Sequence, residues 1–166
     1  MTFLKRFLIP DEVFRQMTDV PFSALYDRGF RIALLDLDNT LAEDHVTEPS
    51  AYTFEVIQKL EAAGFRCCIV SNAKSTRSAD FSARIPIECI SYAHKPSPAG
   101  IYRALALLHA EKSQTIFFGD QIFTDIIAAK RAGVYAVYIE PVTKVEKMYI
   151  RIKRPFERIV RRMYHF

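Results

Sequence analysis

Short apolar runs alternate with amphipathic segments along most of the chain. Five of these runs are rich in Ile, Val, Cys and aromatic residues, and most of them show no alternation of polar and apolar positions. Such runs are typical of strands that are buried on both faces of a parallel sheet. The predicted strands are residues 31–36, 66–71, 87–92, 115–120 and 134–139.

Helical patterns lie between the predicted strands. Apolar residues recur three and four positions apart in these segments, and two of the segments end at a glycine, which is typical of a helix C-terminus. The predicted helices are residues 49–64, 97–110 and 123–133. Strands and helices that alternate through short connections predict a three-layer, Rossmann-like α/β fold with a mainly parallel sheet of about five strands.

Composition indicates one globular domain. The chain has 166 residues, of which half are hydrophobic and a quarter are charged. Its start lacks the continuous apolar region of a signal peptide, and no run approaches the ~18 apolar residues of a membrane-spanning helix. We therefore expect a cytoplasmic protein with one domain over residues 1–140 and an extension over residues 141–166.

The positive charge of the chain is concentrated in this extension. Residues 141–166 contain eight Lys or Arg and two Glu, so the extension carries +6 and the rest of the chain −2. Its apolar residues recur at helical spacing, a pattern typical of a helix on a membrane surface, and Pro155 predicts two short segments. The alternative is that the apolar stripe packs on the domain. Too few aromatic residues are present to favour a nucleic-acid partner.

Polar residues follow four of the predicted strands at their carboxyl ends. Because ligands of such folds bind at this edge of the sheet, we expect these side chains to form one site. They are Asp36, Asp38, Asn39 and Thr40 after the first strand, Ser71 and Asn72 after the second, His94 and Lys95 after the third, and Asp120 and Asp125 after the fourth.

The residue types at this edge favour phosphoryl chemistry. Asp36 and Asp38 repel each other unless a cation lies nearby, and with Asp120 they offer the oxygen ligands that Mg²⁺ prefers. Such an ion would neutralise an incoming phosphate, and an aspartate can accept the phosphoryl group as a covalent aspartyl-phosphate. Ser71 and Lys95 would hold the phosphoryl oxygens. Asp38 would protonate the leaving oxygen and then activate water.

Four motifs in this order resemble those of the haloacid dehalogenase-like (HAD) phosphohydrolases. They read "DLDNT", "SN", "HKP" and "GDQIFTD" over residues 36–125. The resemblance implies a magnesium-dependent phosphatase. It implies Asp36 as nucleophile, Asp38 as general acid/base, and Ser71 and Lys95 as stabilisers of the phosphoryl group. The implied metal ligands are Asp36, Asp120 and the main-chain carbonyl of Asp38. Asp125 is implied as a support for Lys95 or for metal-bound water.

HAD phosphohydrolases commonly carry a cap domain that covers the site. Here 30 residues separate Thr40 from Ser71, and 22 separate Asn72 from Lys95, which leaves no room for a cap domain. We therefore expect a capless member whose open site suits a large substrate or one presented on a surface. We assign substrate contacts in this site to Asn39, Thr40, Asn72 and His94.

Over about residues 8–140 the chain is most similar to the YqeG-like, class IIIA HAD phosphatases. The stretches "IPDEVF" and "GDQIFTDIIAAKRAG" carry this likeness. Because relatives of this group include phosphatidylglycerophosphate phosphatases, it implies an anionic phospholipid substrate and a peripheral position on the inner membrane face. The motifs specify phosphoryl chemistry and not the alcohol, so a soluble sugar phosphate, nucleotide or phosphoprotein is the alternative substrate. A nucleic-acid- or ribosome-associated protein that uses the basic tail is the alternative outside enzymes.

Overall fold

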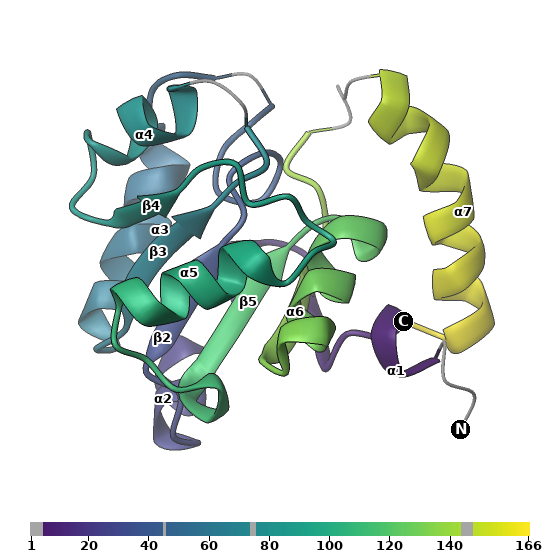
Figure 1. The fold of residues 1–166 in the computed structure, drawn as a ribbon, viewed down its shortest axis with the longest axis horizontal. Helices are drawn as coiled ribbons and strands as arrows, with labels where there is room; N and C mark the ends of the chain where they lie inside the picture. The colour runs from purple at the N-terminus through teal and green to yellow at the C-terminus, as the bar shows by residue number, and fades with distance from the viewer. Residues whose placement is uncertain (1–4, 45, 74–75, 144–147) are drawn as a thin grey trace.

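A six-stranded sheet forms the centre of the molecule. The computed structural model describes residues 5–44, 46–73, 76–143 and 148–166, the side chains of residues 148–153 excepted. The strand order is β1-β6-β5-β2-β3-β4, and all neighbouring strands are parallel. Figure 1 labels β4, β3, β2 and β5 of this sheet. The strands are β1 (Glu12–Phe14), β2 (Ile32–Leu35), β3 (Arg66–Val70), β4 (Glu88–Ile90), β5 (Thr115–Gly119) and β6 (Tyr135–Ile139).

The five predicted strands correspond to β2 to β6, and the predicted Rossmann-like α/β fold is confirmed. The additional strand, β1, has three residues and adds to the edge of the sheet next to β6. The helices are α1 (Lys5–Leu8), α2 (Phe22–Asp27), α3 (Ala51–Ala62), α4 (Arg77–Ser82), α5 (Ala99–Leu107), α6 (Ile127–Ala132) and α7 (Met148–Tyr164), with short helical turns at η1 (Met17–Asp19), η2 (Lys112–Gln114) and η3 (Ile122–Ile126).

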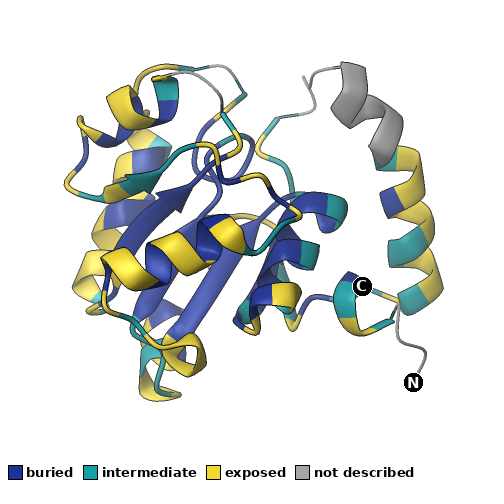
Figure 2. Ribbon diagram, viewed as in Figure 1, coloured by how far each residue is buried: buried dark blue, intermediate teal, exposed yellow. Residues whose placement is uncertain are grey.

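Helices cover both faces of the sheet. In β2, Leu34 and Leu35 are both fully buried, but they belong to different cores because successive side chains of a strand point to opposite faces. One core lies under α2, α3 and α4, and the other lies under α5 and α6. This burial on both faces, visible in Figure 2, explains why the strand sequences lack polar alternation.

The chain order places a topological switch point between β2 and β5. From the central β2 the chain continues to β3 and β4 on one side, and β5 and β6 follow on the other side. In open α/β sheets such a point leaves a crevice at the carboxyl ends of the two strands. The described residues between Thr40 and Ser71 form a loop, α3 and β3, and those between Asn72 and Lys95 form α4 and β4. No cap domain is evident in these described segments.

The C-terminal helix α7 differs from the prediction. We expected Pro155 to divide this segment, but α7 continues through Pro155 as one helix. Proline removes one helical N–H, and contacts on both sides of it hold the helix on the domain: Arg154 pairs with Asp120, and Glu157 accepts from the backbone N–H of Ile122. None of the described helices is long and apolar enough to cross a membrane.

Candidate active site at the carboxyl edge of the sheet

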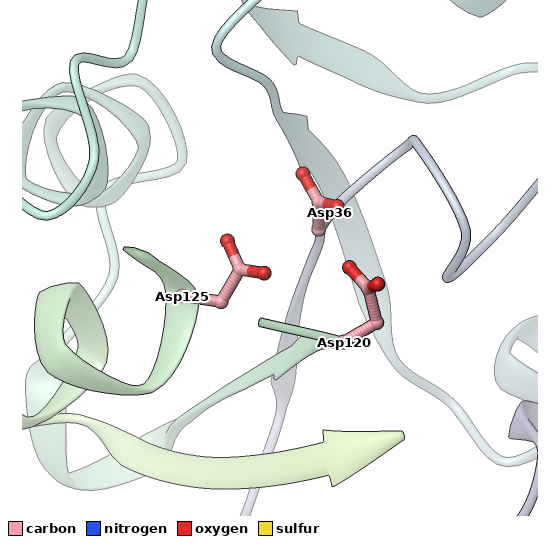
Figure 3. A group of neighbouring side chains, drawn as sticks. All are labelled: Asp36, Asp120 and Asp125. Atoms are coloured by element: carbon pink, nitrogen blue, oxygen red, sulfur yellow. The ribbon is translucent and has the colours of Figure 1, made fainter. Parts of the chain in front are cut away.

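Three aspartates meet at the switch point. Asp36 follows β2, Asp120 follows β5, and Asp125 lies on η3. Each offers a carboxylate oxygen that lies within 4.8 Å of those of the other two. Figure 3 shows the three side chains beside one another. All three residues are buried, and Asp120 is 0% exposed. Such an arrangement is unfavourable for three carboxylates without a compensating positive charge.

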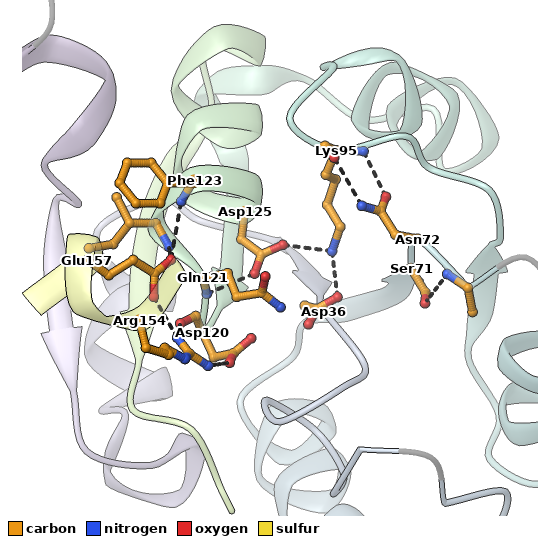
Figure 4. A network of polar contacts seen from close by, with 12 residues as sticks. Asp36, Ser71, Asn72, Lys95, Asp120, Gln121, Phe123, Asp125, Arg154 and Glu157 are labelled. Atoms are coloured by element: carbon orange, nitrogen blue, oxygen red, sulfur yellow. Dashed lines mark hydrogen bonds and ion pairs between the residues drawn. The ribbon is translucent and has the colours of Figure 1, made fainter. Parts of the chain in front are cut away.

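Lys95 supplies part of this charge. Its Nζ lies 2.5 Å from Asp36 Oδ1 and 2.8 Å from Asp125 Oδ1 (Figure 4). The side chain of Asn72 fixes the lysine backbone, because its Nδ2 donates to the Lys95 carbonyl at 3.0 Å and its Oδ1 accepts from the Lys95 N–H at 2.7 Å. Asp125 is itself fixed, since its Oδ2 accepts from the backbone N–H of Gln121 at 3.0 Å.

Burial makes the ionised carboxylates of this group costly. It raises the pKa of Asp36 to about 7, where Lys95 opposes the rise and the nearby Asp125 adds to it. Burial also raises the pKa of Asp120 well above its ordinary range, although Arg154 opposes the rise. For Lys95 burial alone would lower the pKa, but the carboxylates of Asp125 and Asp36 more than offset it and raise the pKa.

The donor set fits a magnesium ion. Oδ1 of Asp120 is buried and has no hydrogen-bond partner among the described residues. A buried carboxylate oxygen without a partner is unfavourable, and a hard divalent cation would satisfy it. The neighbouring oxygens of Asp36 and Asp125 are of the same chemical type. The three carboxylates can therefore hold Mg²⁺ with few protein ligands, as that ion prefers.

Asp38 lies outside this carboxylate group. Both of its oxygens accept from Arg77 Nη2, at 2.5 and 2.6 Å, and Arg77 Nη1 donates to the carbonyl of Val46. The side chain of Asp38 is therefore turned toward α4 and not toward the three buried aspartates. The predicted metal role of Asp38, through its main-chain carbonyl, stays a prediction.

Comparison with known proteins identifies the family. Residues 3–133 match the family model described as "Hydrolase: haloacid dehalogenase-like hydrolase". The chain belongs to this HAD family. "Probable phosphatase YqeG" of Bacillus subtilis is 29% identical over 155 residues, which cover 93% of this chain and 90% of that protein. The chain is thus an HAD-type phosphatase, and the resemblance to the YqeG-like group is confirmed.

Two further likenesses are weaker. "Phosphatidylglycerophosphate phosphatase 1, chloroplastic" of Chlamydomonas reinhardtii is 28% identical over 133 residues, which cover 75% of this chain and 49% of that protein. Among solved structures, the N-terminal part of protein BF1531 from Bacteroides fragilis, containing a phosphatase domain complexed with Mg, superposes with a TM-score of 0.51 at 17% identity. That match covers 74% of this chain and 38% of the other, and it shows the fold alone.

The other predicted site residues of this HAD phosphatase lie around the carboxylate group. Ser71 is buried, and its Oγ accepts from the N–H of Ala73 at 3.1 Å. Asn39 and Thr40 are buried with side-chain oxygens that have no partner among the described residues, whereas His94 is exposed. The catalytic role of Ser71 and the substrate contacts assigned to Asn39, Thr40, Asn72 and His94 stay predictions.

Sequence reasoning missed three charged residues at this site. Arg77 binds Asp38, while Arg154 of α7 pairs with Asp120 and Glu157 in turn pairs with Arg154. Arg154 is one of the eight basic residues of the extension, for which the sequence predicts a membrane surface or packing on the domain. One feature of the sequence could have indicated a buried ion pair in this helix: Glu157 is one of only two acidic residues in a segment with eight basic residues.

Proposed function

We propose that this HAD phosphatase hydrolyses a phosphomonoester with Mg²⁺ through an aspartyl-phosphate on Asp36, and that its substrate is phosphatidylglycerophosphate at a membrane surface. The observation that carries the chemistry is the buried group of Asp36, Asp120 and Asp125 around Lys95. The buried Oδ1 of Asp120, which has no hydrogen-bond partner among the described residues, supports the choice of a metal. The name of the Chlamydomonas reinhardtii relative supports the choice of lipid.

The proposed reaction has two steps at Asp36. A carboxylate oxygen of Asp36 attacks phosphorus, the bond to the leaving alcohol oxygen breaks, and Asp38 donates a proton to that oxygen. Asp38 then takes a proton from water, whose oxygen attacks phosphorus, and the bond to Asp36 breaks to release phosphate. Both oxygens of Asp38 accept from the guanidinium of Arg77, which holds this carboxylate in place.

The surrounding residues position the nucleophile and balance charge. Lys95 holds Asp36 and is itself held by Asp125, and all three residues are buried. Asp36, Asp120 and Asp125 would hold Mg²⁺, which supplies charge that offsets the negative phosphate when bound. With the ion in place Asp36 is expected to be ionised at neutral pH, because a nearby cation favours the charged carboxylate.

The outward face of α7 supports a membrane-surface substrate. Phe156, Ile159 and Met163 are 59%, 56% and 61% exposed and lie at helical spacing; we call them the outer stripe. Large apolar side chains in such a row, with the exposed Arg162 beside them, are typical of a helix that lies on an anionic membrane. The adjoining side of α7 packs on the domain through Val160 and Tyr164. Both alternatives considered for this segment therefore find support, one on each face.

The test measures phosphate release from phosphatidylglycerophosphate in mixed micelles with Mg²⁺. We expect release that disappears in Asp36→Asn, and retention of hydrolysis by that variant would refute the covalent mechanism. Replacing all three residues of the outer stripe by serine should weaken sedimentation with vesicles that contain phosphatidylglycerol, while turnover of p-nitrophenyl phosphate is kept. Point variants are preferable to deletion of α7, because Arg154 and Glu157 of that helix contact the site.

Absence of lipid hydrolysis would separate the two parts of the proposal. If the wild type hydrolyses a soluble phosphate with kcat/KM near or above about 10⁴ M⁻¹s⁻¹ and leaves the lipid unchanged, the soluble alternative is correct. The mechanism on Asp36 would survive that result, and the membrane role of the outer stripe would not.

A further inference from the structure

The helix α7 reaches the metal-ligand group through one arginine. Nη1 of Arg154 donates to the main-chain carbonyl of Asp120 at 2.7 Å, and Nη2 forms an ion pair with Oδ2 of the same residue. The planar guanidinium therefore spans two acceptors of Asp120. Two bonds from a rigid fork fix both the backbone and the side-chain orientation of this aspartate.

This contact leaves the other oxygen of Asp120 free for a cation. Arg154 takes Oδ2, whereas Oδ1 is buried with no hydrogen-bond partner among the described residues. In Figure 4 Asp120 lies between Arg154 and Asp36. The arginine and a metal ion would thus use different oxygens of the carboxylate, and Arg154 does not stand in for the metal.

Glu157 holds Arg154 in this position. Its Oε2 accepts from Arg154 Nη1 at 2.8 Å, and its Oε1 accepts from the backbone N–H groups of Ile122 at 2.8 Å and Phe123 at 3.4 Å. Glu157 is 2% exposed, so its charge is shielded little by water and acts strongly on Arg154. The glutamate also joins α7 to η3, the segment that carries Asp125.

We propose that Arg154, held by Glu157, is a positioning residue for the metal ligand Asp120, so that α7 is part of the active site. This inference rests on the proposed function, in which Asp120 binds Mg²⁺. Removing Arg154 has two opposing effects on the ion. It removes a repelling positive charge, and it frees Asp120 to rotate. We expect the loss of orientation to be the larger effect, because Arg154 holds both the main-chain carbonyl and the carboxylate of Asp120.

The experiment is a calorimetric titration of the full chain with Mg²⁺ in the absence of substrate and lipid. We expect Arg154→Met to weaken Mg²⁺ binding by about tenfold, as loss of residues that orient metal ligands commonly does. Arg154→Lys keeps the charge but lacks the planar fork, so its Mg²⁺ affinity should lie between those of the wild type and Arg154→Met. Turnover of p-nitrophenyl phosphate by Arg154→Met should recover when Mg²⁺ is saturating. Unchanged or tighter binding by Arg154→Met would overturn the proposal.

Three controls make the result specific. Arg158→Met removes an exposed positive charge from the same helix and should bind Mg²⁺ as the wild type does. The double variant with Arg154 and Glu157 both replaced by Met keeps the local charge balanced. It tests the proposal if the single variant fails to fold, and it too should bind Mg²⁺ weakly. Asp120→Asn tests the metal site itself. If Asp120→Asn abolishes binding and Arg154→Met does not weaken it, only the positioning role fails; if Asp120→Asn binds normally, the proposed metal site fails as well.

Discussion

Gly119 at the end of β5 is the position where a single methyl group should disable the site. A Cβ at this glycine would lie 2.7 Å from Cγ and 2.9 Å from Oδ2 of Asp125, and nearer still to its Cβ, whereas ordinary contacts begin at 3.4 Å. Because the Cβ of Asp125 is also in the way, rotation of its carboxylate is not sufficient and η3 must shift. The shift needed at Cγ is about 0.7 Å, the difference between 3.4 and 2.7 Å.

A shift of this size acts directly on Lys95. Its Nζ lies 2.8 Å from Asp125, and an added 0.7 Å would place the pair at the limit of a hydrogen bond. We expect Gly119→Ala to lower the unfolding free energy by about 1–3 kcal/mol, the usual cost of overpacking. The kcat for p-nitrophenyl phosphate should fall by about 10²-fold, because a misplacement near 1 Å can have that effect.

Gly133→Ala is the matched control for this variant. Gly133 has φ +79° and its nearest neighbour is Lys112 Cδ at 3.9 Å, so alanine there is strained but unobstructed. It should lose about 1–2 kcal/mol of stability, measured by urea unfolding, with kcat within twofold of the wild type. If Gly119→Ala loses no more activity than Gly133→Ala, the reasoning that Asp125 must hold Lys95 in place is wrong.

Two further predictions concern the charges of the site. Because burial raises the pKa of Asp36 to about 7 and also raises that of Asp120, Mg²⁺ must displace protons at low pH, and its affinity should rise between pH 5.5 and pH 7.5. Titrations in buffers of different ionisation enthalpy would show the proton release, and equal affinity at pH 5.5 and 7.5 would contradict it. Lys95→Met leaves Asp36 and Asp125 without their cation and should cost about 3–5 kcal/mol in Mg²⁺-free urea unfolding. The cost should be larger at pH 8 than at pH 5.5, where protonation relieves the carboxylates, and a pH-independent cost would exclude this explanation.

The same raised pKa gives the metal-free protein a defined pH dependence of stability. A carboxyl group with a pKa above its ordinary value favours folding while it is protonated, and this contribution disappears as the pH rises through the folded-state pKa. For Asp36 the loss falls between about pH 4 and pH 7. Added Mg²⁺ should therefore stabilise the protein more at pH 7.5 than at pH 5.5.

The sequence predicted that the residues of the candidate site would come together, because the topology of a parallel sheet requires it. Asp36 and Asp120 directly follow apolar runs, Lys95 and Asp125 lie a few residues beyond predicted strands, and the carboxyl ends of parallel strands share one edge. The runs themselves were clear because both faces of the sheet are buried. The edge strand β1 has only three residues, all of intermediate burial, so it offered too little pattern to be found.

The contacts of Arg77 and Arg154 could not be predicted in the same way. Each contact depends on how a helix packs against the rest of the domain. The periodicity of apolar residues indicates which residues share a helix face, but it does not indicate what that face contacts. In α7 the basic and apolar residues suit a membrane surface and a domain surface equally well. The helix presents the outer stripe to solvent, while Glu157 is buried on the inner side.

The balance of charge at the site connects the metal, the raised pKa values and α7. In the network drawn in Figure 4, four carboxylates, those of Asp36, Asp120, Asp125 and Glu157, face two cations, Lys95 and Arg154. The excess of two negative charges equals the charge of one Mg²⁺. Without the ion a buried site can reach neutrality only by binding protons, which is the direction in which the pKa values of Asp36 and Asp120 are shifted. Removing Arg154 alone would raise the excess to three, so the arginine of α7 adjusts the site to a divalent cation as well as orienting Asp120.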